Sequence, residues 1–405
     1  MKVSVLVCFG YLLSISRSKL IFQTNYLVPL QFDYIIIGSG LAGMQLALKL
    51  SQDPFFKNLN VAIIDPSTKE VNDKTWCFWE KGVGKWDELI TKSWDQGKFI
   101  STKANIELQL DPYSYKMLRS IDFYNFVKST LKVKANFHYI LDEIVEIDET
   151  KSIAVGKKEN YTATHFFDSR INSGYLEDSN CTKIFQHFKG LHIKTSSPVF
   201  DKSTFTMMDF RNKFPDSTSF TYVLPFSEKE ALVEFTFFTP FLTEDSIYDK
   251  HLEGYIRDIL KIKEYEVIES EKGVIPMTDY AFHKESSLKT TKIGTAGSWV
   301  KGSTGYSFKH TEKKITQLVQ NIKSGKDPKH DLLNMRSRWY DAIFLDVLNR
   351  RNELGEQLFT EFYNKNTPQE IFKYLDEETD IKEELKIMIS LYHPEFVRSF
   401  FRKLF

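Results

Sequence analysis

The chain has 405 residues, which is enough to bury a large core and to form two connected lobes. Basic and acidic residues both number 54, so the balanced charge offers no electrostatic basis for binding nucleic acid. The spacing of Cys8, Cys77 and Cys181 indicates neither a disulfide framework nor a metal-binding cluster. We therefore expect a cytoplasmic protein without a metal centre.

Residues 1–31 precede the first predicted strand. Within them, Val3–Ile15 is mostly apolar, but it is short for a transmembrane helix and closer in length to the apolar part of a signal peptide. No small-residue cleavage site stands out after it. We expect an upstream extension, for instance from a misassigned start, and a membrane anchor is the alternative.

The most specific pattern in the chain begins with an apolar strand at Tyr34–Ile37, followed by a glycine-rich turn and an apolar-periodic helix. In such a turn, the first glycine permits the tight bend, the second lets backbone approach a pyrophosphate, and the third allows close helix–strand packing. The phosphates would bind N–H groups at the helix N-terminus. The turn consists of Gly38, Ser39, Gly40, Leu41, Ala42 and Gly43.

A second strand over 61–64 ends at Asp65, which lies 22 residues after Gly43. An acid at this spacing binds a ribose hydroxyl in dinucleotide-binding βαβ units. Strand, turn, helix, strand and acid in register predict a dinucleotide site, and a parallel α/β turn without ligand is the alternative.

Further elements follow in chain order. The patterns predict strands over 98–110, a helix from Ser120 to about Leu131, consecutive strands over 137–168, a strand-rich stretch over 184–239, a helix within 245–268 and helices throughout 309–405. A second glycine-rich element lies at 291–308. Because the chain leaves the nucleotide-binding pattern and later returns to it, we expect interleaved domains.

The second glycine-rich element resembles the return strand of FAD enzymes with a hydroxylase-like fold, where a late turn closes over the flavin diphosphate. Aromatic hydroxylases usually carry a Gly-Asp pair in that turn. Here the pair is Gly294-Thr295, so the hydroxylase interpretation loses support.

The whole set of motifs instead resembles the flavin-dependent lycopene cyclases, which close the end rings of carotenoids. The resemblance spans about residues 32–310, in the order of the family. Its local matches are the turn at 38–43, Lys74–Phe78, Tyr222–Phe226, Ala231–Thr236 and Ser303–Phe308, with Ile275–Met277 as a smaller one.

This resemblance implies an α/β protein with an FAD-binding, Rossmann-like fold of the hydroxylase type. An interleaved β-rich (α+β) substrate domain and a helical C-terminal region complete it. We expect the FAD-binding domain over 32–75, 112–178 and 268–325, the substrate domain over 76–111 and 179–267, and the helical region over 326–405. Besides the first turn and Asp65, the expected cofactor contacts are Arg119, Gly297, Thr304 and Gly305, with a surface role as the alternative for Arg119.

The resemblance also assigns an essential glutamate, which here is Glu234. Strand alternation places Leu232, Glu234, Thr236 and Phe238 on one face and Val233, Phe235 and Phe237 on the other. A carboxyl group on such an apolar strand would keep its proton, whereas an edge-strand glutamate would point into water.

Relatives often carry a second acid directly after this glutamate, where this chain has Phe235. Asp209 and Glu271 are the candidate secondary acids. For Asp209, a structural pair with Arg211 is the alternative.

The implied reaction is an isomerisation, in which acid protonates the terminal alkene of lycopene or a related acyclic carotenoid, and the cation closes a β-type ring. Reduced FAD would act electrostatically, with NAD(P)H as a possible external reductant. The candidate cation-stabilising aromatics are Trp76, Phe78, Tyr222, Phe235 and Phe237. The alternatives are a redox flavoenzyme, either a monooxygenase or an isoprenoid double-bond reductase, and a flavin-binding protein without catalysis.

Because carotenoids are insoluble in water, we expect peripheral membrane association. Residues 396–405 combine aromatics with three cations, which suits an interfacial helix. The alternative is a last helix docked on the core with its basic face in water.

Overall fold

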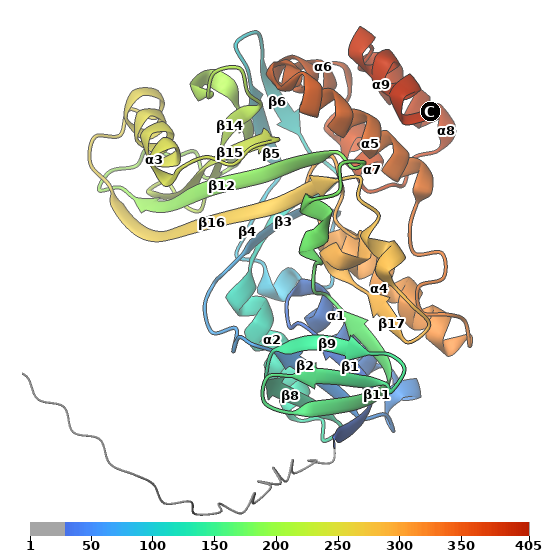
Figure 1. Ribbon diagram of the computed structural model, residues 1–405. Coiled ribbons are helices and arrows are strands. Elements are labelled where there is room, and N and C mark those ends of the chain that lie inside the picture. Colours follow the sequence, from blue (N-terminus) through green and yellow to red (C-terminus); the bar gives the residue numbers. More distant parts are fainter. Residues whose placement is uncertain (1–28, 405) are drawn as a thin grey trace, which may run out of the picture.

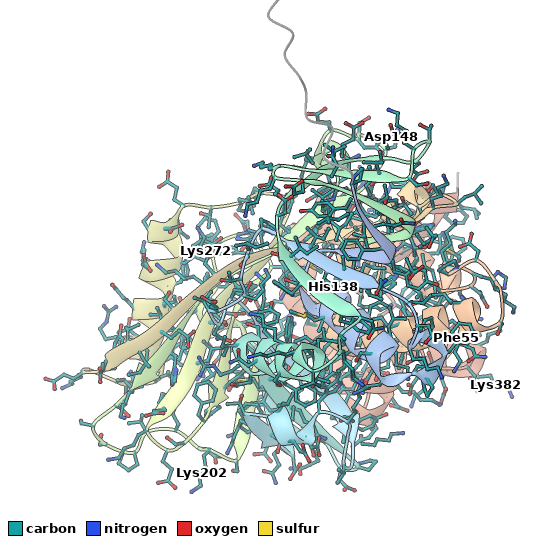
Figure 2. All side chains as sticks on the ribbon, turned by 90° about the horizontal axis from the view of Figure 1, so that it is seen from below. Phe55, His138, Asp148, Lys202, Lys272 and Lys382 are labelled. Carbon is teal, nitrogen blue, oxygen red and sulfur yellow. The ribbon has the colours of Figure 1, made fainter. Side chains whose placement is uncertain are left out.

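The computed structural model describes residues 29–404 (Figure 1). Within that range the chain forms two lobes, each built on a seven-stranded sheet, with a three-stranded sheet between them. In Figure 2, His138 and Asp148 mark the first sheet, and Lys202 and Lys272 mark the second lobe. Cys8 and most of the predicted 1–31 extension lie outside the described residues, whereas Leu30 and Gln31 already belong to the first strand.

The first sheet has the order β8-β2-β1-β11-β10-β9, and β17 pairs with the end of β11. All neighbours are parallel except the pairs that β10 makes with β9 and β11. Parallel strands are covered on both faces, which agrees with the unbroken apolar runs at β1 and β2. The bounds are β1 (Leu30–Ile37), β2 (Val61–Asp65), β8 (Phe137–Leu141), β9 (Ile144–Asp148), β10 (Ile153–Gly156), β11 (Asn160–Asp168) and β17 (Thr290–Lys292).

Three helices pack against the first sheet and bury their apolar sides in one core, which contains Met44, Phe123 and Leu318. They are α1 (Leu41–Gln52), α2 (Ser120–Lys132) and α4 (Phe308–Lys323). The helix predicted from Ser120 to about Leu131 is confirmed as α2.

The second sheet has the order β16-β12-β15-β14-β13-β5-β6, and β5 and β13 form its only parallel pair within 29–404. The long strands β12 and β16 lie side by side in Figure 1. The bounds are β5 (Gln96–Ile100), β6 (Asn105–Gln109), β12 (Lys183–Lys194), β13 (Thr204–Asp209), β14 (Ser219–Pro225), β15 (Glu230–Thr239) and β16 (Glu266–Thr278).

Different helices cover the two faces of this second sheet. Phe235 and Phe237 pack against α3 (Asp245–Gly254) and the single π-helical turn after it (Tyr255–Ile259). The C-terminal helices gather on another side of this lobe, above α4 (Figure 1). They are α5 (Met335–Arg350), α6 (Gly355–Lys365), α7 (Pro368–Leu375), α8 (Ile381–Ser390) and α9 (Pro394–Leu404), which confirms the predicted helical region.

The small sheet has the order β3-β7-β4 and contributes to both cores. Phe78 packs in the core of the first lobe, whereas Trp79 and Tyr115 pack in that of the second. Its strands are β3 (Thr75–Lys81), β4 (Lys92–Trp94) and β7 (Tyr113–Arg119).

Two of the predicted domain boundaries are wrong. The division between 76–111 and 112–178 separates β4 from β7, although these strands are hydrogen-bonded partners. The start of the last FAD-binding segment at 268 falls inside β16, which belongs to the second sheet through Thr278. Both errors have the same cause: strand pairing over long sequence separations leaves no local pattern.

Candidate functional site

A cavity of about 460 Å³ lies where the lobes meet, and we call it the first cavity. It is lined at one end by the glycine-rich turn from Gly40 to Gly43 and elsewhere by strands of the second sheet. Glu234, Glu271, Thr304 and Gly305 also line it. The predicted nucleotide turn and two of the predicted acids, Glu234 and Glu271, therefore share one space.

The backbone of the first turn agrees with the tight bend predicted at Gly38 and the close packing predicted at Gly43. Gly38 has φ +97°, a conformation that favours glycine. A Cβ on Gly43 would lie 1.9 Å from the carbonyl oxygen of Gly38, so the close packing of α1 on β1 requires a glycine there. By contrast, a Cβ on Gly40 would meet nothing within 4 Å, because that residue faces the cavity.

Asp65 ends β2 beside this turn. Its carboxylate accepts hydrogen bonds from the backbone N–H groups of Ser39 (2.6 Å) and Ser67 (2.7 Å). The Ser39 hydroxyl is in turn 2.6 Å from that of Tyr139. A carboxylate has about four acceptor positions, so Asp65 has capacity left for a ribose hydroxyl.

The late glycine-rich turn lies against the first one, since a Cβ on Gly294 would be 3.0 Å from that of Ala42. Gly294 and Gly305 have φ +63° and +77°. Gly294 and Thr295 line the first cavity. Gly297 was predicted to contact the cofactor, but it does not line the cavity. A Cβ on Gly297 would lie only 2.6 Å from the carbonyl oxygen of Lys292, so the local packing requires a glycine there.

Two buried polar atoms beside this turn fit a bound polar group. The Oε1 atom of Gln186 and the hydroxyl of Thr304 have no hydrogen-bond partner among the described residues, and both side chains line the first cavity. A buried polar atom without a partner is costly, and a polar cofactor would remove that cost. Gln186 is a residue that no sequence pattern indicated.

Glu234 lies in the middle of β15, and the predicted alternation is confirmed. Leu232, Glu234, Thr236 and Phe238 all line the first cavity, whereas the alternate residues of β15 pack under α3. Glu234 is only 8% exposed, so the alternative of an edge-strand glutamate in water is excluded. Its Oε1 accepts a hydrogen bond of 2.7 Å from the Thr236 hydroxyl.

Glu271 on β16 is the second acid at this place. It shares a hydrogen bond with Glu234, and the Thr75 hydroxyl donates to its Oε2 at 2.7 Å. Burial, and next the nearby Glu271 charge, raise the pKa of Glu234 to about 8. Burial also raises the pKa of Glu271. The pair therefore holds a proton near neutral pH.

The two acids meet because the residue between them is a glycine. Gly190 on β12 pairs with Glu234 on one side and with Glu271 on the other. A Cβ at Gly190 would lie 3.1 Å from Cγ of Glu271 and 3.0 Å from Cδ1 of Leu232. Gly190 escaped the sequence reasoning, since its role depends on the register of three strands.

Hydroxyl groups of three tyrosines form a chain along another part of the first cavity. Tyr222 donates to Tyr115 at 2.7 Å, and the hydroxyls of Tyr115 and Tyr306 are 2.8 Å apart. Burial raises the pKa of the adjacent Cys77 thiol to about 12. Together with Trp76, these side chains form an aromatic part of the cavity wall.

The structure places two other predicted site residues elsewhere. Asp209 is fully buried, but Arg211 and Tyr255 donate to its carboxylate, and it does not line the first cavity. Asp209 therefore forms the structural ion pair with Arg211 that was the alternative prediction for this residue. Arg119 forms an ion pair of 2.9 Å with Glu269 and does not line the first cavity, so the structure gives no support to the predicted phosphate contact.

Three of the five aromatic residues that were predicted to stabilise a cation do not line the first cavity. Phe235 and Phe237 point to the α3 side of the sheet, as the alternation itself requires. Phe78 stacks on Phe308 in the first core, with ring centroids 4.6 Å apart. Trp76 and Tyr222 do line the cavity.

The C-terminal helix α9 is docked on the core rather than free. Ser399 is buried and donates to the carbonyl of Ile343 at 2.9 Å. The three cations predicted to face lipid are all in ion pairs: Arg398 with Glu395, Arg402 with Asp346, and Lys403 with Asp279. Within 29–404, no helix is both long enough and apolar enough to span a bilayer.

Solved structures with this fold include flavin-dependent enzymes and a reductase-like protein. The flavin-dependent brominase Bmp2 aligns with a TM-score of 0.62 and 13% identity, covering 92% of this chain and 100% of its own. A geranylgeranyl bacteriochlorophyll reductase-like protein from Thermoplasma acidophilum aligns with a TM-score of 0.59 and 13% identity, covering 92% of this chain and 99% of its own. A variant of the halogenase PltM, solved in complex with FAD, aligns with a TM-score of 0.56 and 13% identity, covering 92% of this chain and 90% of its own.

These likenesses confirm the predicted class: an α/β protein with the FAD-binding, hydroxylase-type fold, an interleaved β-rich lobe and a helical C-terminal region. The family described as lycopene cyclase protein matches residues 33–404. The chain therefore belongs to the lycopene cyclase family. No curated protein sequence matches it significantly.

Proposed function

We propose that the protein binds FAD and cyclises the acyclic ends of lycopene or a related carotenoid to β-type rings, with no net oxidation or reduction. The observation that carries this proposal is a pair of buried acids, with pKa values raised by burial, in the same cavity as the glycine-rich turn. Membership of the family supports the choice of substrate.

Glu234 is the proton donor in this proposal. Alkenes are very weak bases, so the acid must be neutral and shielded from water when the substrate arrives, and burial meets both requirements. Its proton forms the new C–H bond at the terminal alkene, the next double bond attacks the tertiary cation, and loss of a ring proton restores neutrality. Glu271, which is hydrogen-bonded to Glu234, would accept the proton that leaves.

The rest of the cavity wall orients the substrate and stabilises positive charge. Trp76, Tyr115 and Tyr222 offer aromatic faces, and each cation–π contact contributes about 0.5–2 kcal/mol. The first turn, Asp65, Gln186 and Thr304 would hold the dinucleotide. FAD, kept reduced by a donor such as NAD(P)H, would supply negative charge near the cation.

We also propose that the protein contacts the membrane from the cytoplasm through α8 and α9. Ile381, Leu385 and Ile389 follow each other at helical spacing on α8 and are exposed, as are Phe401 and Leu404 on α9. An exposed apolar face of this kind suits the lipid boundary. Because the cations of α9 are paired, apolar contact rather than charge would dominate.

The test is to express the chain in a lycopene-accumulating bacterial host and to identify the extracted pigment. Cyclised ends of unchanged elemental composition are expected. Products that gain oxygen or hydrogen would instead support the redox alternative, a monooxygenase or a double-bond reductase. Unchanged lycopene, with flavin bound and reductant present, would contradict the proposal.

A further inference from the structure

A second cavity, also of about 460 Å³, lies among helices α5 to α9. Its wall is almost entirely aliphatic and aromatic, including Phe344, Leu358 and Met388. Two of its polar side chains are engaged elsewhere: Asp341 pairs with Lys301 at 3.0 Å, and the Tyr340 hydroxyl donates to Glu384 at 3.1 Å. The second cavity therefore suits a ligand without polar groups.

The two cavities are neighbours. Thr304, Phe359, Phe362 and Leu375 line both, so their side chains form a shared wall between the α5–α9 cavity and the space beside Glu234. Thr304 belongs to the late turn that is expected to face the cofactor. The inner end of the second cavity thus lies next to the site of chemistry.

The outer end of the second cavity reaches the surface at α8 and α9. Tyr392 and Phe401 line it and are 74% and 54% exposed, and Val397 and Phe400 also line it and are exposed. These residues adjoin the apolar stripe of α8. An apolar passage therefore leads from an exposed apolar surface to the shared wall.

We infer that the second cavity holds the body of a long hydrocarbon substrate while its reacting end lies beside Glu234. This inference rests on the proposed function. The first cavity extends from the nucleotide turn to the acids, so it must accommodate the dinucleotide as well as the reacting end. Ligand pockets typically measure about 300–1,000 Å³, so one such space cannot also enclose a chain many times longer than the ring that forms.

The inferred path requires Phe359 and Phe362 to admit the chain between them. Both side chains are buried on α6, so the opening requires both rings to change rotamer. The substrate would then enter from the surface at Tyr392 and Phe401, and its far end would remain in the second cavity during the reaction.

The experiment fills the second cavity without touching the first. Met388→Trp places bulk inside it, and Lys382→Trp places the same bulk at an exposed position of α8 that does not line the second cavity. We expect Met388→Trp to keep its flavin and to lose at least tenfold in kcat/KM for lycopene in liposomes, with Lys382→Trp within twofold of the wild type. Equal values for both variants would overturn the inference.

A binding measurement separates this inference from the proposed function. In Glu234→Gln protein, which should bind lycopene without converting it, the polyene should quench the fluorescence of Trp339, a residue of the second cavity. Trp339→Phe provides the background. If Met388→Trp fails to fold, Leu358→Phe narrows the same cavity from α6. Cyclisation by the wild type without quenching at Trp339 would overturn the inference alone, whereas no cyclisation would overturn the proposed function.

Discussion

Glu234 and Glu271 lie on strands that are not neighbours, yet their carboxyl groups share a hydrogen bond across Gly190. Strands two apart in a sheet are separated by roughly 10 Å, so two glutamates can meet only if the strand between them presents no side chain. Two carboxylates in contact cannot both be ionised, and the pair therefore retains a proton.

Glu234→Gln should abolish cyclisation while leaving the fold and flavin content unchanged. The amide keeps the shape of the side chain and can still accept from Thr236, but it has no acidic proton. Lycopene conversion by purified holoenzyme measures the effect, and Thr236→Val on the same strand face should be milder. A Glu234→Gln rate within about threefold of the wild type corresponds to less than 1 kcal/mol of transition-state stabilisation, too little for the sole proton donor.

Gly190→Ala should lower activity about tenfold and shift its pH profile. The added methyl group approaches Glu271 and Leu232 to about 3 Å, so the carboxyl group must move by a few tenths of an ångström. Alanine is otherwise acceptable in a strand. Gly254→Ala is the matched control, because a Cβ there meets nothing within 4 Å. The idea fails if both variants have wild-type pH profiles.

The rate of cyclisation should fall as the pH rises above about 8, because the donor must be protonated and the pKa of Glu234 is raised to about 8. The slope should approach tenfold per pH unit. Glu234→Asp, with the acid drawn back from the substrate, should be slow across the whole range.

The same shift predicts how stability depends on pH. Glu234 binds its proton more tightly in the folded protein than in the unfolded chain, whose pKa is about 4.3. Its contribution to the free energy of unfolding is therefore complete below that value and is lost as the pH rises toward 8, at up to about 1.4 kcal/mol per unit. Urea denaturation at several pH values should show a smaller slope for Glu234→Gln than for the wild type. Equal slopes would mean that Glu234 is ionised in the folded protein.

Two glycines of the first turn should respond in opposite ways to the same substitution. Gly40→Val has free space and should fold, but its side chain would occupy the position of the pyrophosphate, so the protein should purify without flavin. Gly43→Val would collide with the Gly38 carbonyl and should lower the melting temperature strongly. Absorbance near 450 nm and thermal denaturation distinguish the two. If Gly40→Val protein is yellow, it still binds flavin, and the cofactor does not bind at this turn.

Replacing the apolar stripe of α8 should reduce membrane binding. Leu385→Glu with Ile389→Glu removes two exposed apolar side chains, and Val83→Glu with Leu288→Glu makes the same change at exposed positions elsewhere. Sedimentation with liposomes should fall severalfold only for the first pair. Deletion of 396–405 should also weaken binding, but it removes part of the second cavity as well and is therefore less specific.

Local sequence patterns predicted the structural features that are determined by residues close together in the sequence. The βαβ unit, Asp65 and the two faces of β15 follow from periodicity and spacing, and the structure has them as expected. Thr75 lies in a segment that had been singled out, although its contact with Glu271 had not.

Features that depend on distant partners were not predictable. The carboxylate of Asp209 has an arginine two residues away, and only the fold shows that Tyr255 completes that pair and keeps it out of the cavity. Arg119 precedes a helix, as expected, but Glu269 on β16 attracts it. Most of the second cavity is formed by side chains from five helices, for which no local pattern predicted a cavity, and Ser303 and Thr304 of the late turn also line it.

The late turn at Gly294 lies against Ala42 of the first turn, although all strands of the second sheet lie between them in sequence. Contacts between distant segments form late in folding, because loop closure is entropically unfavourable. A cofactor that needs both turns can therefore recognise only a chain whose folding is nearly complete, and it stabilises that state by mass action. The amount of this protein in a cell should accordingly follow the supply of riboflavin, and flavin starvation should deplete it through proteolysis rather than leave an intact apoprotein.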